Sequence, residues 1–82
     1  MNDYNLNKAI GQWLSDHRKQ KGLSQQQVAD RLGVTKTAVH YWETGKRMIF
    51  AETMIDYCKI LNLDPQDLVR DISPLITKED DS

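Results

Sequence analysis

Two signals that stop one helix and start the next stand close together in the first half of this sequence. Residues 22–24 read Gly-Leu-Ser and residues 33–35 read Gly-Val-Thr. Glycine ends a helix readily because it adopts the left-handed conformation at little cost, and a Ser or Thr two residues later caps the next helix. The pattern predicts two short helices, at about 25–32 and about 36–44, joined by a tight turn.

Further signals fix how the chain enters these two helices. The apolar residue before each cap has an apolar partner at the fourth helical position, which sets the entry angle. These pairs are Leu23 with Val28 and Val34 with Val39. Ser24 also has Gln27 three residues later, which completes a capping box. Two short helices set across such a turn predict a helix-turn-helix, whose second helix can enter the major groove of DNA.

Apolar residues at helical spacing predict three further helices. The first begins between Asn5 and Asn7 and ends near Lys21, and the fourth spans about 50–61. The fifth begins at Pro65, after Asn-Leu-Asp, which repeats the stop-and-cap pattern with Asn in place of Gly. The expected apolar face of the fourth helix consists of Met54, Ile55, Cys58 and Leu61.

The C-terminal residues are expected to differ from the rest. Pro74 disfavours a regular helix beyond about Ile72. Residues 1–72 are therefore predicted to form one helix-turn-helix DNA-binding domain, and residues 73–82 an acidic, flexible tail. No segment has the period of a strand, so the predicted fold class is all-α, a compact domain of five helices.

Charge is divided unequally between the two halves of the chain. The 82 residues have a formal net charge of −1. Residues 1–50 carry eight Lys or Arg and four Asp or Glu, a net of +4, whereas residues 51–82 carry three and eight, a net of −5. The predicted helix-turn-helix lies in the basic half, which favours a polyanionic partner for that half.

No catalytic, metal or cofactor site is predicted. His17 and His40 fall on different helices, and Cys58 has no neighbouring ligands at metal-binding spacing. Cys58 is expected in the core, and as the single cysteine it forms no internal disulfide, which fits a reducing cytoplasm. The apolar runs are too short to span a bilayer, and no secretory leader is visible.

The outer face of the third helix supplies the candidate contacts to bases. Its polar members are Lys36, Thr37, His40, Tyr41 and Thr44. Lys36 can donate to guanine O6 and N7, and the Thr37 methyl group can pack on thymine. Tyr41 can reach either a base edge or a phosphate, whereas for His40 a solvated helix position is the common alternative.

Residues beside this face are candidate phosphate ligands. Gln25 and Gln26 open the second helix, where backbone N–H groups favour an anion. Lys46 and Arg47 follow the third helix and would flank the groove, although loop cations also serve solubility alone. Thr44, at the end of the outer face, is a further candidate.

From about Ile10 to Val69 the sequence resembles the Cro/repressor-like (XRE) family of phage and bacterial regulators. The resemblance rests on Arg18, on the opening Ser-Gln at 24–25, on Leu-Gly-Val at 32–34 and on Trp-Glu-Thr-Gly-Lys at 42–46. It implies the phage-repressor-like domain fold and a regulator, such as a repressor or a Cro-like switch, that binds a palindromic operator as a homodimer. Half-sites in such operators lie about one helical turn, ~10 bp, apart.

The resemblance also assigns roles to individual residues. It pairs Arg18 with Glu43 as a partly buried ion pair, with Arg18 also placed near a phosphate. The family's base-contacting positions fall on Gln25, Lys36, Thr37 and Tyr41, in agreement with the outer-face argument. No cofactor is implied.

The sequence departs from the family pattern after Arg47. The family usually has a proline and a small capping residue there, whereas this chain reads Met48-Ile49-Phe50. The fourth helix is therefore expected to lack a side-chain cap, and one or more of these apolar residues to reach a subunit contact. The alternative function is an antitoxin or adaptor that also binds a protein partner, through the acidic tail with Leu75 and Ile76.

Overall fold

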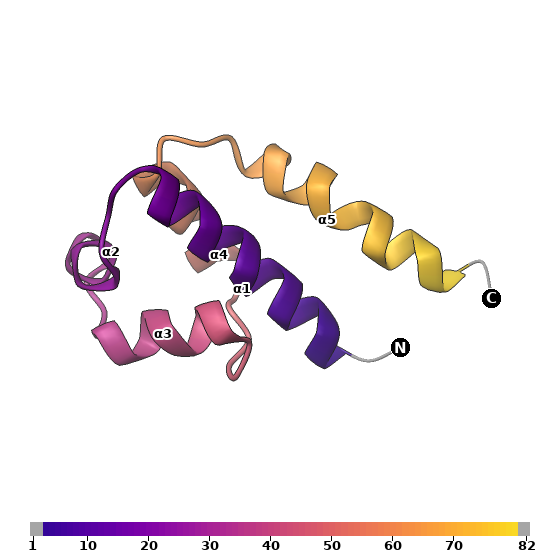
Figure 1. Ribbon diagram of the computed structural model, residues 1–82, viewed down its shortest axis with the longest axis horizontal. Helices are drawn as coiled ribbons and strands as arrows, with labels where there is room; N and C mark the ends of the chain where they lie inside the picture. Colours follow the sequence, from indigo (N-terminus) through magenta and orange to yellow (C-terminus); the bar gives the residue numbers. More distant parts are fainter. Residues whose placement is uncertain (1–2, 81–82) are drawn as a thin grey trace.

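The structure, a computed structural model, describes the backbone of residues 3–80 and the side chains of residues 6–75. Over residues 3–80 it consists of five helices and no strand (Figure 1). They are α1 (Asp3–Gln20), α2 (Gln25–Leu32), α3 (Lys36–Thr44), α4 (Ala51–Ile60) and α5 (Pro65–Asp80). The predicted all-α fold is confirmed, and no described helix is both long and apolar enough to cross a membrane.

The helices α2 and α3 have the bounds that their stop-and-cap signals predict. Ser24 accepts a hydrogen bond from the Gln27 backbone N–H at 3.0 Å, and the Gln27 side chain accepts from the Ser24 N–H at 2.8 Å. Gly33 ends α2 with φ at 74°, and Thr35 caps α3 by accepting from the Ala38 N–H. The turn between α2 and α3 is therefore fixed at both sides by hydrogen bonds.

The helices α4 and α5 begin in different ways. Phe50 precedes α4 and makes no side-chain cap, as the departure from the family pattern predicts. Asn62 takes φ of 59°, the left-handed conformation expected from the stop-and-cap pattern. Asp64 then accepts from the Gln66 backbone N–H at 2.9 Å and caps α5.

The predicted end of the fifth helix near Ile72 is wrong, because α5 continues through Pro74. Proline lacks an N–H group and so removes one helical hydrogen bond. Pro74 is exposed, so water can reach the carbonyl group that loses its partner. Residues 73–80 are therefore helical, and residues 81–82 of the expected tail lie outside the described part of the chain.

Buried side chains from all five helices form one core. Those that are at most 1% exposed are Leu14, Val28, Ala29, Val39, Tyr57, Cys58 and Leu61. One prediction for α4 is wrong: Ile55 is 38% exposed, and Tyr57 lies in the core. The pattern of apolar residues does not predict Tyr57 in the core, because a buried phenol requires a hydrogen-bond partner that this pattern does not reveal.

The helix α1 lies at the centre of the packing, against α3 and α5, while α2 packs against α3 and α4 (Figure 1). At the α1–α5 contact the indole N–H of Trp13 donates to the Asp71 carboxylate at 2.8 Å, and this bond lowers the pKa of Asp71. His17 stacks on Trp13 with ring centroids 3.9 Å apart. Trp13, which is 8% exposed, is thus covered from α5.

Candidate nucleic-acid interface

The outer face of α3 carries the polar side chains predicted to read DNA. The exposed members are Lys36, Thr37, His40 and Thr44. Tyr41, at the edge of the face, is half-buried. Val39 and Glu43 are buried on the opposite side of the helix. Because both helix ends are capped and the inner face is packed, α3 presents this polar face as a rigid unit.

The end of α3 carries a small aromatic and cationic cluster. The Lys46 ammonium lies 5.9 Å and the Arg47 guanidinium 5.4 Å from the centre of the Tyr41 ring. The backbone N–H of Lys46 also donates to the Tyr41 carbonyl at 3.0 Å. Tyr41 therefore holds the two cations that were predicted to contact phosphates next to the outer face of α3.

A buried ion pair joins α1 to α3. Arg18 donates to Glu43 through Nε at 2.8 Å and through Nη2 at 2.9 Å, a bidentate pair. Both residues are 7% exposed. The third nitrogen, Nη1, donates to the Leu23 carbonyl at 2.8 Å. The Arg18 guanidinium is thus used mainly within the fold, with two of its five N–H groups left for another partner.

Two more helices donate to the same carboxylate. The Gln25 amide of α2 donates to Glu43 Oε1 at 3.0 Å, and the Tyr57 hydroxyl of α4 donates to Glu43 Oε2. One carboxylate on α3 therefore receives hydrogen bonds from α1, α2 and α4. No described buried side-chain N or O atom lacks a partner, so the network is complete.

The network fixes the charges of its members. Burial raises the pKa of Glu43, but hydrogen bonds from Arg18, Gln25 and Tyr57 lower it by more, so the carboxyl pKa lies below its ordinary value. The hydrogen bond to Glu43 raises the pKa of Arg18, against the effect of burial. Burial and the neighbouring carboxylate raise the pKa of Tyr57. At neutral pH an ionised pair is therefore held beside a protonated phenol.

Several predicted DNA contacts already have partners within the protein. Gln25 has one amide hydrogen bonded to Glu43 and keeps the second, while the Gln26 amide donates to Asp30 at 2.9 Å. The Thr44 hydroxyl donates to the His40 carbonyl at 2.9 Å. Thr44 can therefore offer DNA an acceptor oxygen rather than a donor, which suits a phosphate poorly.

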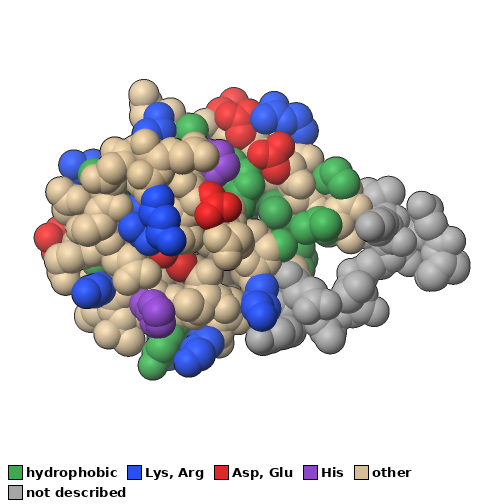
Figure 2. All heavy atoms as spheres, in the orientation of Figure 1, with side chains coloured by type: hydrophobic (Ala, Val, Ile, Leu, Met, Phe, Trp, Pro, Cys, Tyr) green, Lys and Arg blue, Asp and Glu red, His purple; other side chains and the backbone are tan. Residues whose placement is uncertain are grey.

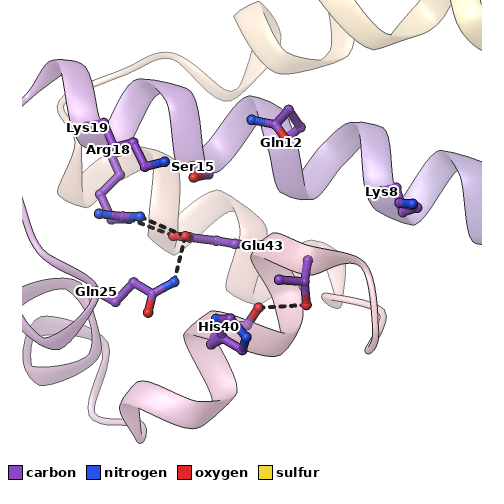
Figure 3. Close-up of a pocket in the computed structure, with 9 residues that line it drawn as sticks. Lys8, Gln12, Ser15, Arg18, Lys19, Gln25, His40 and Glu43 are labelled. Carbon is purple, nitrogen blue, oxygen red and sulfur yellow. Dashed lines mark hydrogen bonds and ion pairs between the residues drawn. The ribbon is translucent and has the colours of Figure 1, made fainter.

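A polar cleft of about 400 Å³ opens between α1, α2 and α3. Its walls are formed by Lys8, Gln12, Ser15, Arg18, Lys19, Gln25, His40, Glu43 and Thr44. In Figure 3 the α1 residues Lys8, Gln12, Ser15 and Lys19 follow one wall, and Gln25 and His40 stand opposite. This wall was not predicted from the sequence, although its signal is visible as polar residues spaced four, three and four apart on α1.

Acidic side chains lie mainly away from the outer face of α3. In Figure 2, which shows α1, α2 and α3 in front, Lys and Arg side chains are spread over these helices, and acidic side chains gather over the first part of α5. There Arg70 forms ion pairs with Asp67 and Asp71 at 3.1 and 3.6 Å. The charge asymmetry of the sequence is thus also an asymmetry of the surface.

The described residues offer no arrangement for metal chemistry. No group of three or more His, Cys, Asp or Glu side chains that could hold a metal ion occurs among them. Cys58 is buried, and burial raises the pKa of its thiol to about 11. Cys58 is therefore a core residue, as the sequence predicts.

Comparison with known proteins agrees with this geometry. Residues 14–68 match the helix-turn-helix family. The matched segment includes α2, α3, the turn between them and most of the core. The chain belongs to this family of XRE-type regulators. The membership confirms the resemblance drawn from the capped turn and the segment around Glu43.

Relatives of this helix-turn-helix chain are regulators. It is 44% identical over 46 residues to the "uncharacterized HTH-type transcriptional regulator YqaE" of Bacillus subtilis (strain 168); the match spans 56% of this chain and 40% of that protein. The restriction-modification controller protein C.AhdI of Aeromonas hydrophila superposes with a TM-score of 0.78 at 28% identity, over 83% of this chain and 99% of that one. The clp gene regulator ClgR of Corynebacterium glutamicum shares the fold, with a TM-score of 0.77 at 22% identity over 92% of this chain and 84% of that one.

Proposed function

We propose that this chain is a transcriptional regulator, a repressor or a Cro-like switch, that binds double-stranded DNA and reads a palindromic operator as a homodimer. The observation that carries the proposal is the exposed polar face of α3, held rigidly by two caps and by the Glu43 network. Membership of the helix-turn-helix family supports it. Residues 1–72 are the DNA-binding part.

The proposed contacts follow from the positions of the side chains. Lys36 and Thr37, in the first turn of α3, contact base edges together with Gln25. His40 and Tyr41 lie one turn further along: the exposed His40 contacts a base edge, and the half-buried Tyr41 a base edge or a phosphate. Lys46 and Arg47 contact phosphates, and Gln26 and Arg18 contribute to the backbone contact at the start of α2.

The proposed homodimer uses apolar side chains that the fold leaves uncovered. Met48 and Phe50, in the loop after α3, are 54% and 70% exposed, and Val69 and Leu75 on α5 are 56% and 46% exposed. Figure 2 shows hydrophobic side chains gathered where α5 approaches α1. Such a set of exposed apolar residues favours contact with a second copy over contact with water.

Selection of bound sites from a random DNA pool tests specificity, symmetry and dimerisation together. We expect enrichment of a palindrome with half-sites about one helical turn, ~10 bp, apart. Ultracentrifugation of the protein with the selected duplex is expected to give two chains per duplex. A pool that stays random would exclude a specific reader, and a single unpaired half-site bound by one chain would exclude the homodimer.

Two lysines of the interface are expected to respond differently to truncation. Lys36→Ala should cost about 1–3 kcal/mol on the selected site and relax the preference at one base step. Lys46→Ala should lower the affinity for all DNA sequences alike and reduce the slope of log K against log salt by about one. Fluorescence anisotropy on the selected and on a scrambled duplex measures both. A loss for Lys46→Ala that is confined to the selected site would contradict a phosphate contact.

A further inference from the structure

The cleft between α1 and α3 is lined by more cations than acids. Among the described residues that form it, Lys8, Arg18 and Lys19 face a single carboxylate, that of Glu43. Arg18 neutralises Glu43 through two hydrogen bonds. Lys19 therefore adds positive charge to a cleft whose one lining carboxylate is already paired with Arg18.

The cleft also offers neutral donors to an anion. Ser15, one turn before Lys19 on α1, is only 8% exposed and lines the cleft. Figure 3 shows Ser15 and Lys19 next to each other on the α1 wall, with Gln25 and His40 opposite. The Gln25 amide uses one hydrogen on Glu43 and keeps a second. A hydroxyl, an amide and an ammonium group can thus converge on one set of anionic oxygens.

The shape and position of the cleft restrict the kind of anion. It is open to solvent and lined mainly by polar groups, unlike the enclosed, mostly apolar pockets that bind small organic ligands. His40 and Thr44 belong both to the cleft and to the outer face of α3. A duplex whose groove receives α3 therefore carries one of its sugar-phosphate strands along the mouth of the cleft.

We propose that this cleft binds a phosphodiester group of the DNA backbone, with Lys19 as its cation and Ser15 and Gln25 as hydrogen-bond donors. The proposal rests on the proposed DNA-binding function and adds a phosphate site on α1 to the contacts from α2, α3 and the following loop. A phosphate held between α1 and α3 fixes the angle at which α3 enters the groove, because both walls of the cleft touch the same group.

The test compares Lys19→Gln with Lys59→Gln on the selected duplex. Lys59 is an exposed lysine of α4, outside the cleft, and serves as the matched control. We expect Lys19→Gln to lower affinity about five- to tenfold at about 0.1 M salt and to reduce the slope of log K against log salt by about 0.9, with base preference unchanged. Lys59→Gln should change neither. Equal behaviour of the two variants would overturn the proposal.

A second measurement locates the phosphate. Neutral methylphosphonate linkages are placed one at a time along the selected duplex, and each duplex is titrated with the unmodified protein and with Lys19→Gln. At one position per half-site, the methylphosphonate linkage should lower the DNA affinity of the unmodified protein about fivefold and that of Lys19→Gln much less. If the loss of affinity caused by the linkage and the loss caused by Lys19→Gln simply add at every position, the proposal is overturned. Ser15→Ala should lose affinity about twofold and keep the full salt slope.

Two controls separate this proposal from other outcomes. Titration with inorganic phosphate, followed by amide NMR shifts of Ser15 and Gln25, should give no saturation below about 10 mM, because the cleft is open and the backbone strand is positioned by α3. If phosphate saturates the cleft below about 10 mM and Lys19→Gln binds DNA as well as the unmodified protein does, the cleft is a site for a free anion and the proposal is wrong. If the unmodified protein binds DNA without sequence preference, the proposed function itself is refuted. If it binds a specific sequence but Lys19→Gln leaves the DNA affinity unchanged, only this phosphate site is refuted.

Discussion

Glu43→Gln is expected to lower the free energy of unfolding by about 3–5 kcal/mol, the loss typical when one member of a buried ion pair is removed. The variant keeps the shape of the side chain but loses its charge, so the buried Arg18 guanidinium has no counterion. The hydrogen bonds from Gln25 and Tyr57 then meet a neutral amide. In a chain of this size the melting temperature should fall by about 12 °C or more.

Urea denaturation measures the loss, with Asp56→Asn as control. Asp56 is an exposed carboxylate in the middle of α4, and its replacement should change stability by less than about 0.5 kcal/mol. Tyr57→Phe removes only the phenol hydroxyl from the network and should cost about 1 kcal/mol while leaving the protein folded. Loss of less than about 1 kcal/mol for Glu43→Gln would contradict the role of the buried charge.

The same network predicts a pH dependence. The folded pKa of Glu43 lies below its value in the unfolded chain, which is about 4.3. Such a group stabilises the fold above the unfolded pKa, and its contribution is lost as the pH falls through the folded pKa. The difference in stability between the unmodified protein and Glu43→Gln should therefore be constant near neutral pH and should shrink in acid.

The turn and its two helices could be predicted from sequence because their ends depend on local chemistry. Ser24 with Gln27, Thr35 and Gly33 interact with backbone groups within a few residues, so the signal and its effect lie in the same short segment. The end of α5 could not be predicted in the same way. Pro74 is a local signal against helix, and it was outweighed because the position is exposed and only one hydrogen bond is lost.

The residues that were missed depend on contacts between helices distant in sequence. Tyr57 is buried because its hydroxyl meets Glu43, which lies fourteen residues earlier on another helix. The polar wall of α1 becomes a cleft only when α3 and the start of α2 stand opposite it. Sequence periodicity indicates which face of a helix is polar, but the facing residues come from the tertiary fold.

Gly11→Ala is expected to destabilise the protein by about 2 kcal/mol or more, although alanine is the better helix former. At an exposed helix position the exchange should stabilise by about 1 kcal/mol. Gly11, however, lies in α1 where it crosses α3, and a Cβ there would stand 2.3 Å from the Trp42 carbonyl oxygen and 2.6 Å from that of Glu43. Both are backbone atoms, so α3 itself must move, at a cost of about 3 kcal/mol or more.

Urea denaturation and DNA binding test the two consequences of that movement. Gln20→Ala, at the exposed end of α1, is the control for helix propensity and should be near neutral. Because α3 carries both Glu43 and the outer face proposed to contact DNA, Gly11→Ala should also weaken binding to the selected duplex under conditions where it is folded. A more stable variant would show that α1 and α3 have room to separate. Reduced stability with normal DNA affinity would show that α3 moves without changing the angle of its outer face.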